Sequence, residues 1–296
     1  MKIAILHHDL EESEKILKGL LEERDIKVKL IDIRNTEIGD FEGVEIVLNR
    51  VYASVANRDF SSNENALILL KQLENRGIRC VNSLLTSFYD YSKYDTYKIM
   101  INNGILTPKT LFISKREEIV KISKAAIDEF GLPIIVKRNS GGRAKDLFKA
   151  DSEEKLVEIL ESRFDLAEEE DYRGGFVLQN LIKSNKGFDC RVGIVGGEFA
   201  FSYGRDLIAD ESGEKWFSSV SKGSKRFDFD VSEEDKKIAI QVSNLIGAEY
   251  NIVDIMYSDA GTVVIESNPT PNYVNNDNKD ISRMNKFIDV LLEVQQ

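Results

Sequence analysis

Apolar positions in the first part of the chain form short runs that alternate with segments of helical spacing. Short apolar runs are typical of buried strands, and apolar residues at three- and four-residue intervals are typical of helices that bury one face. The predicted segments, in chain order, are a strand at 2–6, a helix at 11–24, strands at 27–31 and 45–48, a helix at 63–76 and a short strand at Val81. Because strands that alternate with helices build parallel sheets, residues 1–87 are predicted to form a small parallel α/β domain.

The pattern changes between residues 88 and 178, where strands and a helix lie on each side of a loop. The predicted segments are a helix at 92–103, an extended piece at 107–112, a helix at 115–130, strands at 134–138 and 146–150, and a helix that begins after Ser152. Ser114 and Glu117 have the spacing of a capping box for the helix at 115–130. This part of the chain is predicted to be α+β and to form a central domain.

Residues 179–296 are predicted to form a third domain, built mainly from antiparallel strands. The predicted segments are strands at 176–182, 189–195 and 198–203, a polar loop at 206–226, a helix at 232–246, strands at 250–257 and 262–266, and a final helix from about Asp280. Gly196 and Gly197 form a two-residue hairpin turn between two of these strands. The acidic stretch at 168–171 is interpreted as a solvated connection.

The predicted hairpin at 250–266 carries polar residues within an apolar frame. Asp254 is surrounded in sequence by isoleucine, valine and methionine, and Glu266 and Asn268 share one strand face because they are two residues apart. Antiparallel pairing would bring the three side chains together at one end of the sheet, and carboxylate and amide oxygens suit Mg²⁺. The alternative is a hairpin whose polar residues only face solvent, and the pattern alone leaves both readings open.

A second candidate site surrounds Lys137, which ends an apolar strand and precedes the glycine-bearing loop at 139–145. The backbone N–H groups of such a loop approach phosphate oxygens closely, and a lysine adds positive charge. Lys93, at the start of the helix at 92–103, is another phosphate candidate, although most helical lysines are solvated. The strand end at 179–183 either pairs with an adenine edge or is only part of the core.

Three charged residues on neighbouring predicted strands form a third candidate group. Asp189 and Arg191 share one strand face because they are two residues apart, and Arg205 ends the following strand. One interpretation is a structural salt bridge. The other is that the arginines balance the charge of a phosphoryl group or bind a substrate carboxylate through two hydrogen bonds.

Composition and charge argue against several classes of function. The 296-residue chain has a formal net charge of −11 and a pI of about 5.0, which argues against a protein that binds nucleic acid by broad phosphate neutralisation. No apolar run approaches the length of a membrane helix, and the sequence enters a strand directly, so we expect a cytoplasmic protein that does not contact a membrane.

Cysteine and histidine usage narrows the chemistry further. Cys80 and Cys190 are too far apart for a paired-cysteine zinc or redox motif. His7 and His8 are the only histidines, so a Ser-His-Asp hydrolase is not expected and a histidine-rich zinc site is excluded. A histidine base or a single zinc ligand after the first strand is the minor interpretation.

Taken in chain order, these features resemble one known family. The ordered set is Lys93, Thr107-Pro108, Lys137 with its glycine loop, Gln179–Ile182, Asp189-x-Arg191, Arg205, Asp254, and Glu266-x-Asn268 followed by Pro271. This set resembles the ATP-grasp superfamily in its RimK-like branch of carboxylate–amine ligases, which includes glutamate ligases. The resemblance covers nearly the whole chain. It implies an ATP-grasp fold, α/β and α+β, with a small parallel pre-ATP-grasp domain at 1–87 and ATP-grasp subdomains at 88–178 and 179–296.

The resemblance also implies roles for individual residues. It implies that ATP phosphates are bound by Lys93, Lys137, Gly141, Gly142 and Arg143, and that the adenine pocket includes Gln179, Leu181 and Ile182. It implies that two Mg²⁺ ions, for which Mn²⁺ is an accepted substitute, are bound by Asp254, Glu266 and Asn268. The expected catalytic residues are Arg205, facing the phosphoryl group, and Arg191, which borders the ATP and acceptor sites together with Asp189. Arg50 is the expected substrate-facing arginine, with a surface arginine as the alternative.

The chain departs from the family pattern at three places. The phosphate loop has Ala144 and Asp146 where the family commonly has glycines, so closure of the loop over ATP is expected to differ. The segment after Trp216 has serines where the family often has an asparagine. This difference leaves undetermined which acceptor is bound. Asn272 replaces a usual glycine, and only a local turn is expected to change.

The implied reaction is the ATP-dependent joining of a carboxylate to an amine through an acyl phosphate, with an amino acid such as glutamate added to a small molecule or peptide. One alternative is an ATP-grasp enzyme that modifies a precursor peptide or protein. Another is a non-catalytic nucleotide-binding protein that keeps the architecture. Family members are often dimers or tetramers, so the expectations include a homo-oligomer. The sequence names neither substrate nor the number of residues added.

Overall fold

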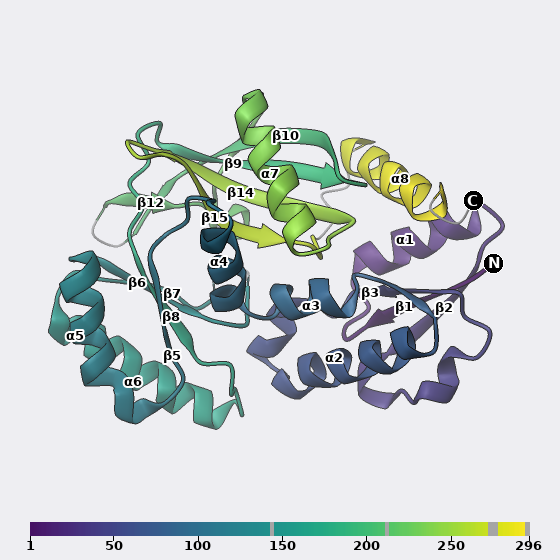
Figure 1. Cartoon of the computed structure of the whole chain (residues 1–296), viewed down its shortest axis with the longest axis horizontal. Coiled ribbons are helices and arrows are strands. Elements are labelled where there is room, and N and C mark those ends of the chain that lie inside the picture. The colour runs from purple at the N-terminus through teal and green to yellow at the C-terminus, as the bar shows by residue number, and fades with distance from the viewer. Residues whose placement is uncertain (143–144, 211–212, 272–277, 294–296) are drawn as a thin grey trace.

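The computed structural model describes residues 1–142, 145–210, 213–271 and 278–293. These residues form one parallel sheet, two antiparallel sheets and a small two-stranded hairpin, with helices on the outer faces of the sheets (Figure 1). No helix in these ranges is both long enough and apolar enough to cross a membrane.

The N-terminal part is built on a parallel four-stranded sheet with the order β2-β1-β3-β4. Its strands are β1 (Lys2–His7), β2 (Lys27–Asp32), β3 (Ile46–Asn49) and β4 (Arg79–Val81). Its helices are α1 (Glu12–Glu22), α2 (Phe60–Asn75) and α3 (Leu84–Asp90), with 3₁₀ turns η1 (Ile33–Asn35), η2 (Ile38–Phe41) and η3 (Ala53–Asn57). The predicted parallel sheet is confirmed, whereas α3 was not anticipated by the apolar pattern.

The central part is an antiparallel sheet with the order β5-β8-β6-β7, reached from the first sheet through α4 (Lys93–Asn102). Its strands are β5 (Thr110–Ile113), β6 (Ile134–Arg138), β7 (Leu147–Ala150) and β8 (Phe176–Asn180). The helices α5 (Ile119–Phe130) and α6 (Glu153–Glu169) cover its outer face, and their apolar side chains share one core with β6 and β8 (Figure 1).

The third sheet is also antiparallel and has the order β13-β10-β9-β14-β15. Its strands are β9 (Phe188–Val195), β10 (Glu198–Asp206), β13 (Arg226–Phe227), β14 (Tyr250–Ser258) and β15 (Gly261–Asn268). The helix α7 (Glu233–Leu245) packs against it, capped at its start by Ser232 as predicted. The predicted polar loop at 206–226 contains short elements: β11 (Ile208–Ala209), β12 (Lys215–Phe217) and the 3₁₀ turn η5 (Val220–Lys222).

One local prediction is wrong, and another holds only in part. The helix α5 begins at Ile119 after the 3₁₀ turn η4 (Arg116–Glu118), and neither turn nor helix starts with a side-chain capping bond, so Ser114 and Glu117 form no capping box for it. The interpretation of the acidic stretch 168–171 as a solvated connection holds only in part: Glu168, Glu169 and Asp171 are exposed, but α6 continues to Glu169 and the carboxylate of Glu170 pairs with the buried guanidinium of Arg138. Such a carboxylate is held by the charge that it compensates rather than by solvent.

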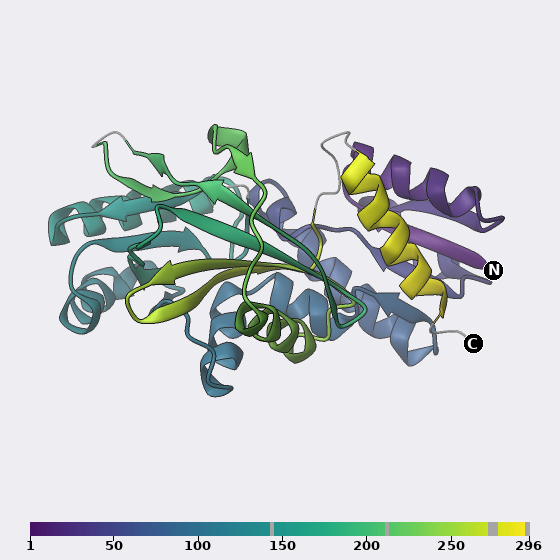
Figure 2. The same cartoon turned by 90° about the horizontal axis from the view of Figure 1, so that it is seen from above.

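The C-terminal helix α8 (Asn278–Glu293) returns to the N-terminal sheet and lies beside α1 (Figure 2). Its apolar side chains enter the core formed by β1, β3 and α1; they are Met284, Phe287, Ile288 and Leu291. Arg24 at the end of α1 donates to Asn285 at 3.0 Å and pairs with Asp289 at 3.2 Å. The two ends of the described chain are therefore joined through one apolar core.

We predict that Phe287→Ala lowers the free energy of unfolding by about 3–5 kcal/mol, because removing a buried ring leaves a cavity in the shared core. The ring centroid of Phe287 lies 5.6 Å from that of Tyr250 on β14. The measurement is denaturant unfolding followed by circular dichroism. Ile281→Ala is the control in the same helix, where the side chain is 41% exposed, and a change below about 1 kcal/mol is expected. Equal effects of the two variants would mean that Phe287 is not part of the core.

Candidate active site

A cavity of about 390 Å³ is lined by residues of both the central and the third sheet and by the segment around η3. The predicted site residues in its lining are Lys93, Lys137, Gly141, Gly142, Gln179, Leu181, Ile182, Asp189, Arg191, Arg205, Asp254, Glu266 and Asn268. The structure therefore brings together side chains that are spread over most of the sequence. Arg143, also predicted here, lies outside the described residues.

Lys93 and the glycine loop form one end of the cavity. The Nζ of Lys93 donates to the carbonyl of Gly141 at 2.7 Å and lies 3.4 Å from Oε1 of Glu266. Gly141 has a φ of +153°, and a Cβ there would lie 2.7 Å from Oδ1 of Asn57. The Nδ2 of Asn57 donates to the carbonyl of Gly142 at 3.2 Å. The loop is thus held by the N-terminal part on one side and by α4 on the other.

Lys137 extends from β6 into the same cavity. The pKa of its amine is lowered to about 8, chiefly by burial and also by the nearby Lys93 ammonium, while Glu266 and Asp254 oppose the shift. Two lysines that face the same space repel each other in the free protein. A polyanion bound between them would relieve this repulsion.

Another part of the cavity lining consists of Gln179, Leu181 and Ile182, at and just beyond the end of β8. The Nε2 of Gln179 donates to the hydroxyl of Thr110 at 2.8 Å. Its Oε1 is buried and has no partner among the described residues. Apolar side chains beside an unpaired buried acceptor suit an aromatic base that carries an amino group.

Four charged side chains from β9, β10 and β14 form the floor of the site. The guanidinium of Arg205 donates to Asp189 at 2.9 and 2.6 Å and to Asp254 at 2.9 Å. Arg191 pairs with Asp254 at 3.0 Å, and the hydroxyl of Ser218 donates to Asp189 at 2.5 Å. Salt bridges are therefore present, although Asp189 pairs with the arginine of the neighbouring strand and not with Arg191. Because all four side chains also line the cavity, the pairs do not exclude a role in binding.

Burial and mutual attraction shape the titration of these groups. Burial raises the pKa of Asp189 above its usual value, although Arg205 acts in the opposite direction. Burial lowers the pKa of Arg205, but Asp254 and Asp189 outweigh it and raise the pKa well above the usual value for a guanidinium. The arginines consequently remain charged at every accessible pH.

The candidate metal ligands converge as the sequence predicts. Asp254 on β14 lies directly opposite Glu266 on β15, and Asn268 lies opposite Ile252, on the same face. Oδ1 of Asp254 is buried and accepts no hydrogen bond from the described residues, although Nε of Arg191 is 3.0 Å away. Among these residues no group of three or more His, Cys, Asp or Glu side chains is arranged around one metal position. Two carboxylates and an amide still fit Mg²⁺, which keeps several waters and shares phosphate oxygens.

Arg50 is buried and does not line the cavity. Its Nε donates to Glu14 at 3.1 Å, and its Nη2 donates to the hydroxyl of Tyr52 and to the carbonyl of Pro271, both at 2.9 Å. Arg50 therefore connects the N-terminal part to the segment that follows the metal ligands. Its expected contact with a substrate stays a prediction.

The comparisons with known proteins agree with this geometry. The profile of the RimK-like ATP-grasp domain matches residues 91–291. The chain belongs to the RimK-like ATP-grasp family. ATP-grasp ligases use ATP and Mg²⁺.

Curated relatives of this RimK-like chain are ligases and synthases. It is 27% identical over 204 residues to N-acetylaspartylglutamate synthase A of Homo sapiens, covering 69% of this chain and 49% of the relative. It is 23% identical over 286 residues to the probable alpha-L-glutamate ligase of Methanococcoides burtonii, covering 92% of this chain and 88% of the relative. The chain spans about half the length of the first of these relatives.

The solved structure of the D-alanine–D-alanine ligase from Bacillus anthracis complexed with ATP has the same fold. The match has a TM-score of 0.72 at 18% identity and covers 99% of this chain and 96% of the other. This similarity confirms the predicted ATP-grasp architecture.

Several residues that line the RimK-like cavity were not predicted. They are Tyr52, Asn57, Asp90, Arg226 and Thr270. No spacing marks them, because they come from turns, strand ends and the end of α3, which approach the cavity only in the folded chain. For Asp90 alone the sequence offers a weak indication, because it lies three residues before the predicted phosphate ligand Lys93.

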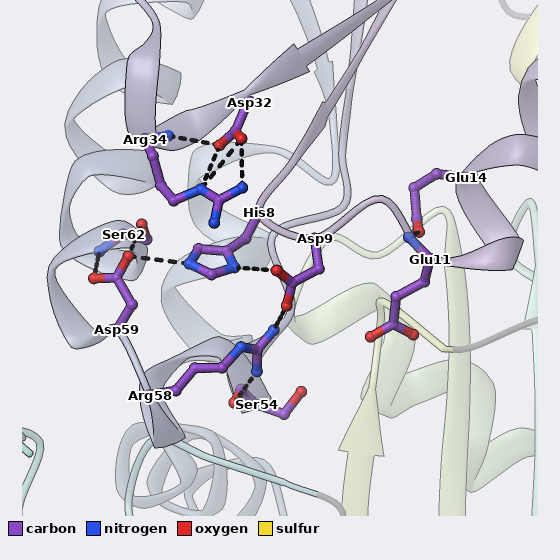
Figure 3. A network of polar contacts seen from close by, with 10 residues as sticks. All are labelled: His8, Asp9, Glu11, Glu14, Asp32, Arg34, Ser54, Arg58, Asp59 and Ser62. Atoms are coloured by element: carbon purple, nitrogen blue, oxygen red, sulfur yellow. Dashed lines mark hydrogen bonds and ion pairs between the residues drawn. The ribbon is translucent and has the colours of Figure 1, made fainter.

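The two histidines lie away from this site. His8 is buried between Asp59 and Asp9, at 3.0 and 3.1 Å, and Arg58 pairs with Asp9 (Figure 3). Asp59 also caps the start of α2 through the backbone N–H of Ser62. The network joins the loop after β1 to α2, and neither histidine lines the cavity. These contacts hold the loop after β1 against α2, so they indicate a structural role for His8.

We predict that Lys137→Met stabilises the nucleotide-free protein at pH 7 and that this gain shrinks as the pH rises. The folded-state pKa of about 8 lies below the value of about 10.4 expected in the unfolded chain, so unfolding binds a proton between these values and stability rises with pH there. The measurement is the melting temperature of variant and wild type from pH 7 to 10. Lys124→Met, on the exposed face of α5, is the control. A difference between variant and wild type that is independent of pH would contradict the shifted pKa.

Proposed function

We propose that this protein is an ATP-dependent carboxylate–amine ligase that forms an amide or peptide bond through an acyl phosphate. The observation that carries the proposal is one cavity in which Lys93 and Lys137 face Asp254, Glu266 and Asn268. The two lysines can bind the phosphates of a nucleoside triphosphate, and the carboxylate and amide oxygens can bind its metal ion. Membership of the RimK-like family supports the same reading.

Each part of the cavity has a role in this proposal. Lys93, Lys137 and the backbone of Gly141 and Gly142 would neutralise and orient the phosphates. Gln179, Leu181 and Ile182 would enclose the adenine. Asp254, Glu266 and Asn268 would hold two Mg²⁺ ions, for which Mn²⁺ could substitute; bound metal would neutralise the charge on the phosphate oxygens.

The reaction has two balanced steps. An oxygen of the substrate carboxylate forms a bond to the γ-phosphorus of ATP, and the bond from that phosphorus to ADP breaks. The ammonium form of the amine releases one proton to solvent, and its nitrogen then forms a bond to the acyl carbon. The bond from that carbon to the phosphate oxygen breaks, phosphate leaves with the electron pair, and the second proton passes from the nitrogen to phosphate. Arg205 and Arg191 would stabilise the negative charge that moves between these groups. No enzyme nucleophile takes part.

We infer that the substrates include an amino acid, with glutamate as the first candidate. The names of the two curated relatives, a glutamate ligase and an N-acetylaspartylglutamate synthase, support this choice. The non-catalytic alternative is not favoured, because a domain that has lost catalysis has no need to keep both lysines and the oxygen ligands in one cavity. Modification of a precursor peptide remains an outcome of the substrate screen described below.

We predict that Glu266→Gln lowers ADP formation by at least about 100-fold, because the amide keeps the size of the side chain but removes the charge that would bind the metal. The measurement is ADP release with ATP, Mg²⁺ and a panel of carboxylates and amines. Glu198→Gln, an exposed position at the start of β10, is the control and should leave the rate unchanged. Unaltered ADP formation in a folded Glu266→Gln protein would reject the metal assignment.

The activity itself is tested by trapping the acyl phosphate with hydroxylamine. A ligase gives a hydroxamate that requires ATP and one particular carboxylate, and hydroxylamine replaces the natural amine. The panel contains amino acids, dipeptides, cofactor acids and peptides. Hydroxamate from a small acid supports the small-molecule ligase, and hydroxamate only from peptides supports the peptide modifier. Absence of hydroxamate with every carboxylate would overturn the proposed function.

A further inference from the structure

Among the residues that the structure describes, five acidic side chains line the cavity, and four of them already have a cationic partner. The lining acids are Asp90, Asp146, Asp189, Asp254 and Glu266. Asp146 pairs with Arg138, and the three others pair with the arginines of the floor or with Lys93. Asp90 has no Lys, Arg or His side chain within 4.0 Å among the residues that the structure describes. It is therefore the carboxylate with unused charge.

One oxygen of Asp90 is fixed and the other is available. The hydroxyl of Thr270 donates to Oδ2 of Asp90 at 2.8 Å, while Oδ1 accepts no hydrogen bond from the described residues. Thr270 lies two residues beyond the metal ligand Asn268, so Asp90 is held at the metal end of the cavity. The contact joins α3 of the N-terminal part to the end of the third sheet.

The helix that carries Asp90 has a defined position. The hydroxyl of Thr86 on α3 donates to the carbonyl of Gly247 at 2.8 Å, and Asn49 at the end of β3 donates to Ser87 at 2.9 Å. Figure 1 shows α3 between the first sheet and α4, which begins with Lys93. Asp90 is thus presented from a helix that is anchored on two sides. A rigid, pre-positioned charge is what specific recognition requires.

An unpaired carboxylate in this position is costly unless a ligand compensates it. Burial raises the pKa of Asp90 to about 6, and Glu266 adds to the shift, whereas Lys93 and Arg50 oppose it. The group is still ionised at neutral pH. Because ATP and the substrate carboxylate are anions, the protonated amine is the organic substrate of the proposed reaction that has the opposite charge.

We propose that Asp90 binds the ammonium group of the amine acceptor and so selects acceptors that carry a free, protonated amine. The inference rests on the proposed ligase function and adds the subsite for its second substrate. An ammonium has three N–H donors: one fits the free Oδ1, and the hydroxyl of Thr270 offers an acceptor beside it. Mg²⁺ suits the position less well, since it requires several oxygen ligands in octahedral order and Asp90 brings one free oxygen.

The test compares wild type with Asp90→Asn, which keeps the shape and the hydrogen bond from Thr270 but removes the charge. With a carboxylate that yields hydroxamate, the KM of the amino acid acceptor should rise by about 10- to 100-fold, as expected for a lost charged hydrogen bond. The KM of ATP, the Mg²⁺ dependence and the rate with hydroxylamine, which is largely uncharged near neutral pH, should stay within about two-fold. Asp128→Asn, on the exposed face of α5, is the matched control.

A binding measurement decides the inference even without turnover. Each standard amino acid and its N-acetyl derivative is titrated calorimetrically into wild type and Asp90→Asn. Wild type should prefer at least one free amine to its acetylated form by about 10-fold or more, and the variant should lose that preference. No preference in wild type, or the same preference in the variant, overturns the ammonium subsite. A changed Mg²⁺ dependence in the variant would overturn it in favour of a metal role.

Absence of hydroxamate in wild type with every carboxylate would instead count against the ligase function. The titrations would still test whether Asp90 binds an ammonium group.

Discussion

The register of β9, β10, β14 and β15 is the constraint on which the rest of the site depends. Asp254 lies opposite both Arg191 and Glu266, and Asp189 lies opposite Arg205. A slip of one residue in any of these strands would turn its charged side chains to the other face of the sheet. Unpaired charges would then be left in a buried environment, which is strongly destabilising. The pairing that keeps the sheet stable is therefore also the pairing that collects the candidate ligands at one place.

The paired charges have a second consequence for the cavity. Lys93 pairs with Glu266 and bonds to the carbonyl of Gly141, and the arginines of the floor pair with Asp189 and Asp254. Each acid thus has a cation beside it before any ligand enters. Binding of an anion and a metal would exchange these partners instead of creating new charges in the interior, and such an exchange avoids most of the desolvation penalty of burying isolated ions. Asp90 differs from the other acids because its partner would have to come from the ligand.

The sequence predicted those elements whose cause is local. Gly196 and Gly197 adopt φ values of +61° and +77°, as a two-residue hairpin requires, and the hairpin of β14 and β15 turns where the pattern indicates. The strand that carries Lys137 has the predicted bounds, 134–138. Features that the sequence did not predict have tertiary causes. The carboxylate of Glu170 pairs with the buried guanidinium of Arg138, and Arg50 donates to Glu14, a partner 36 residues away that no spacing reveals.

By itself the sequence determined the alternation of elements, the parallel first sheet and the ordered residues that resemble the ATP-grasp family. These depend on periodicity, turn chemistry and residue type, all of which act over short separations. Only the tertiary structure decided which charges pair, how α8 rejoins the first sheet, and which cavity acid has no cationic partner among the described residues. Asp90 and Thr270 are 180 residues apart, and their contact exists only because the N-terminal part packs against the end of the third sheet beside the cavity. Contacts between distant segments depend on how whole elements pack, which local patterns do not encode.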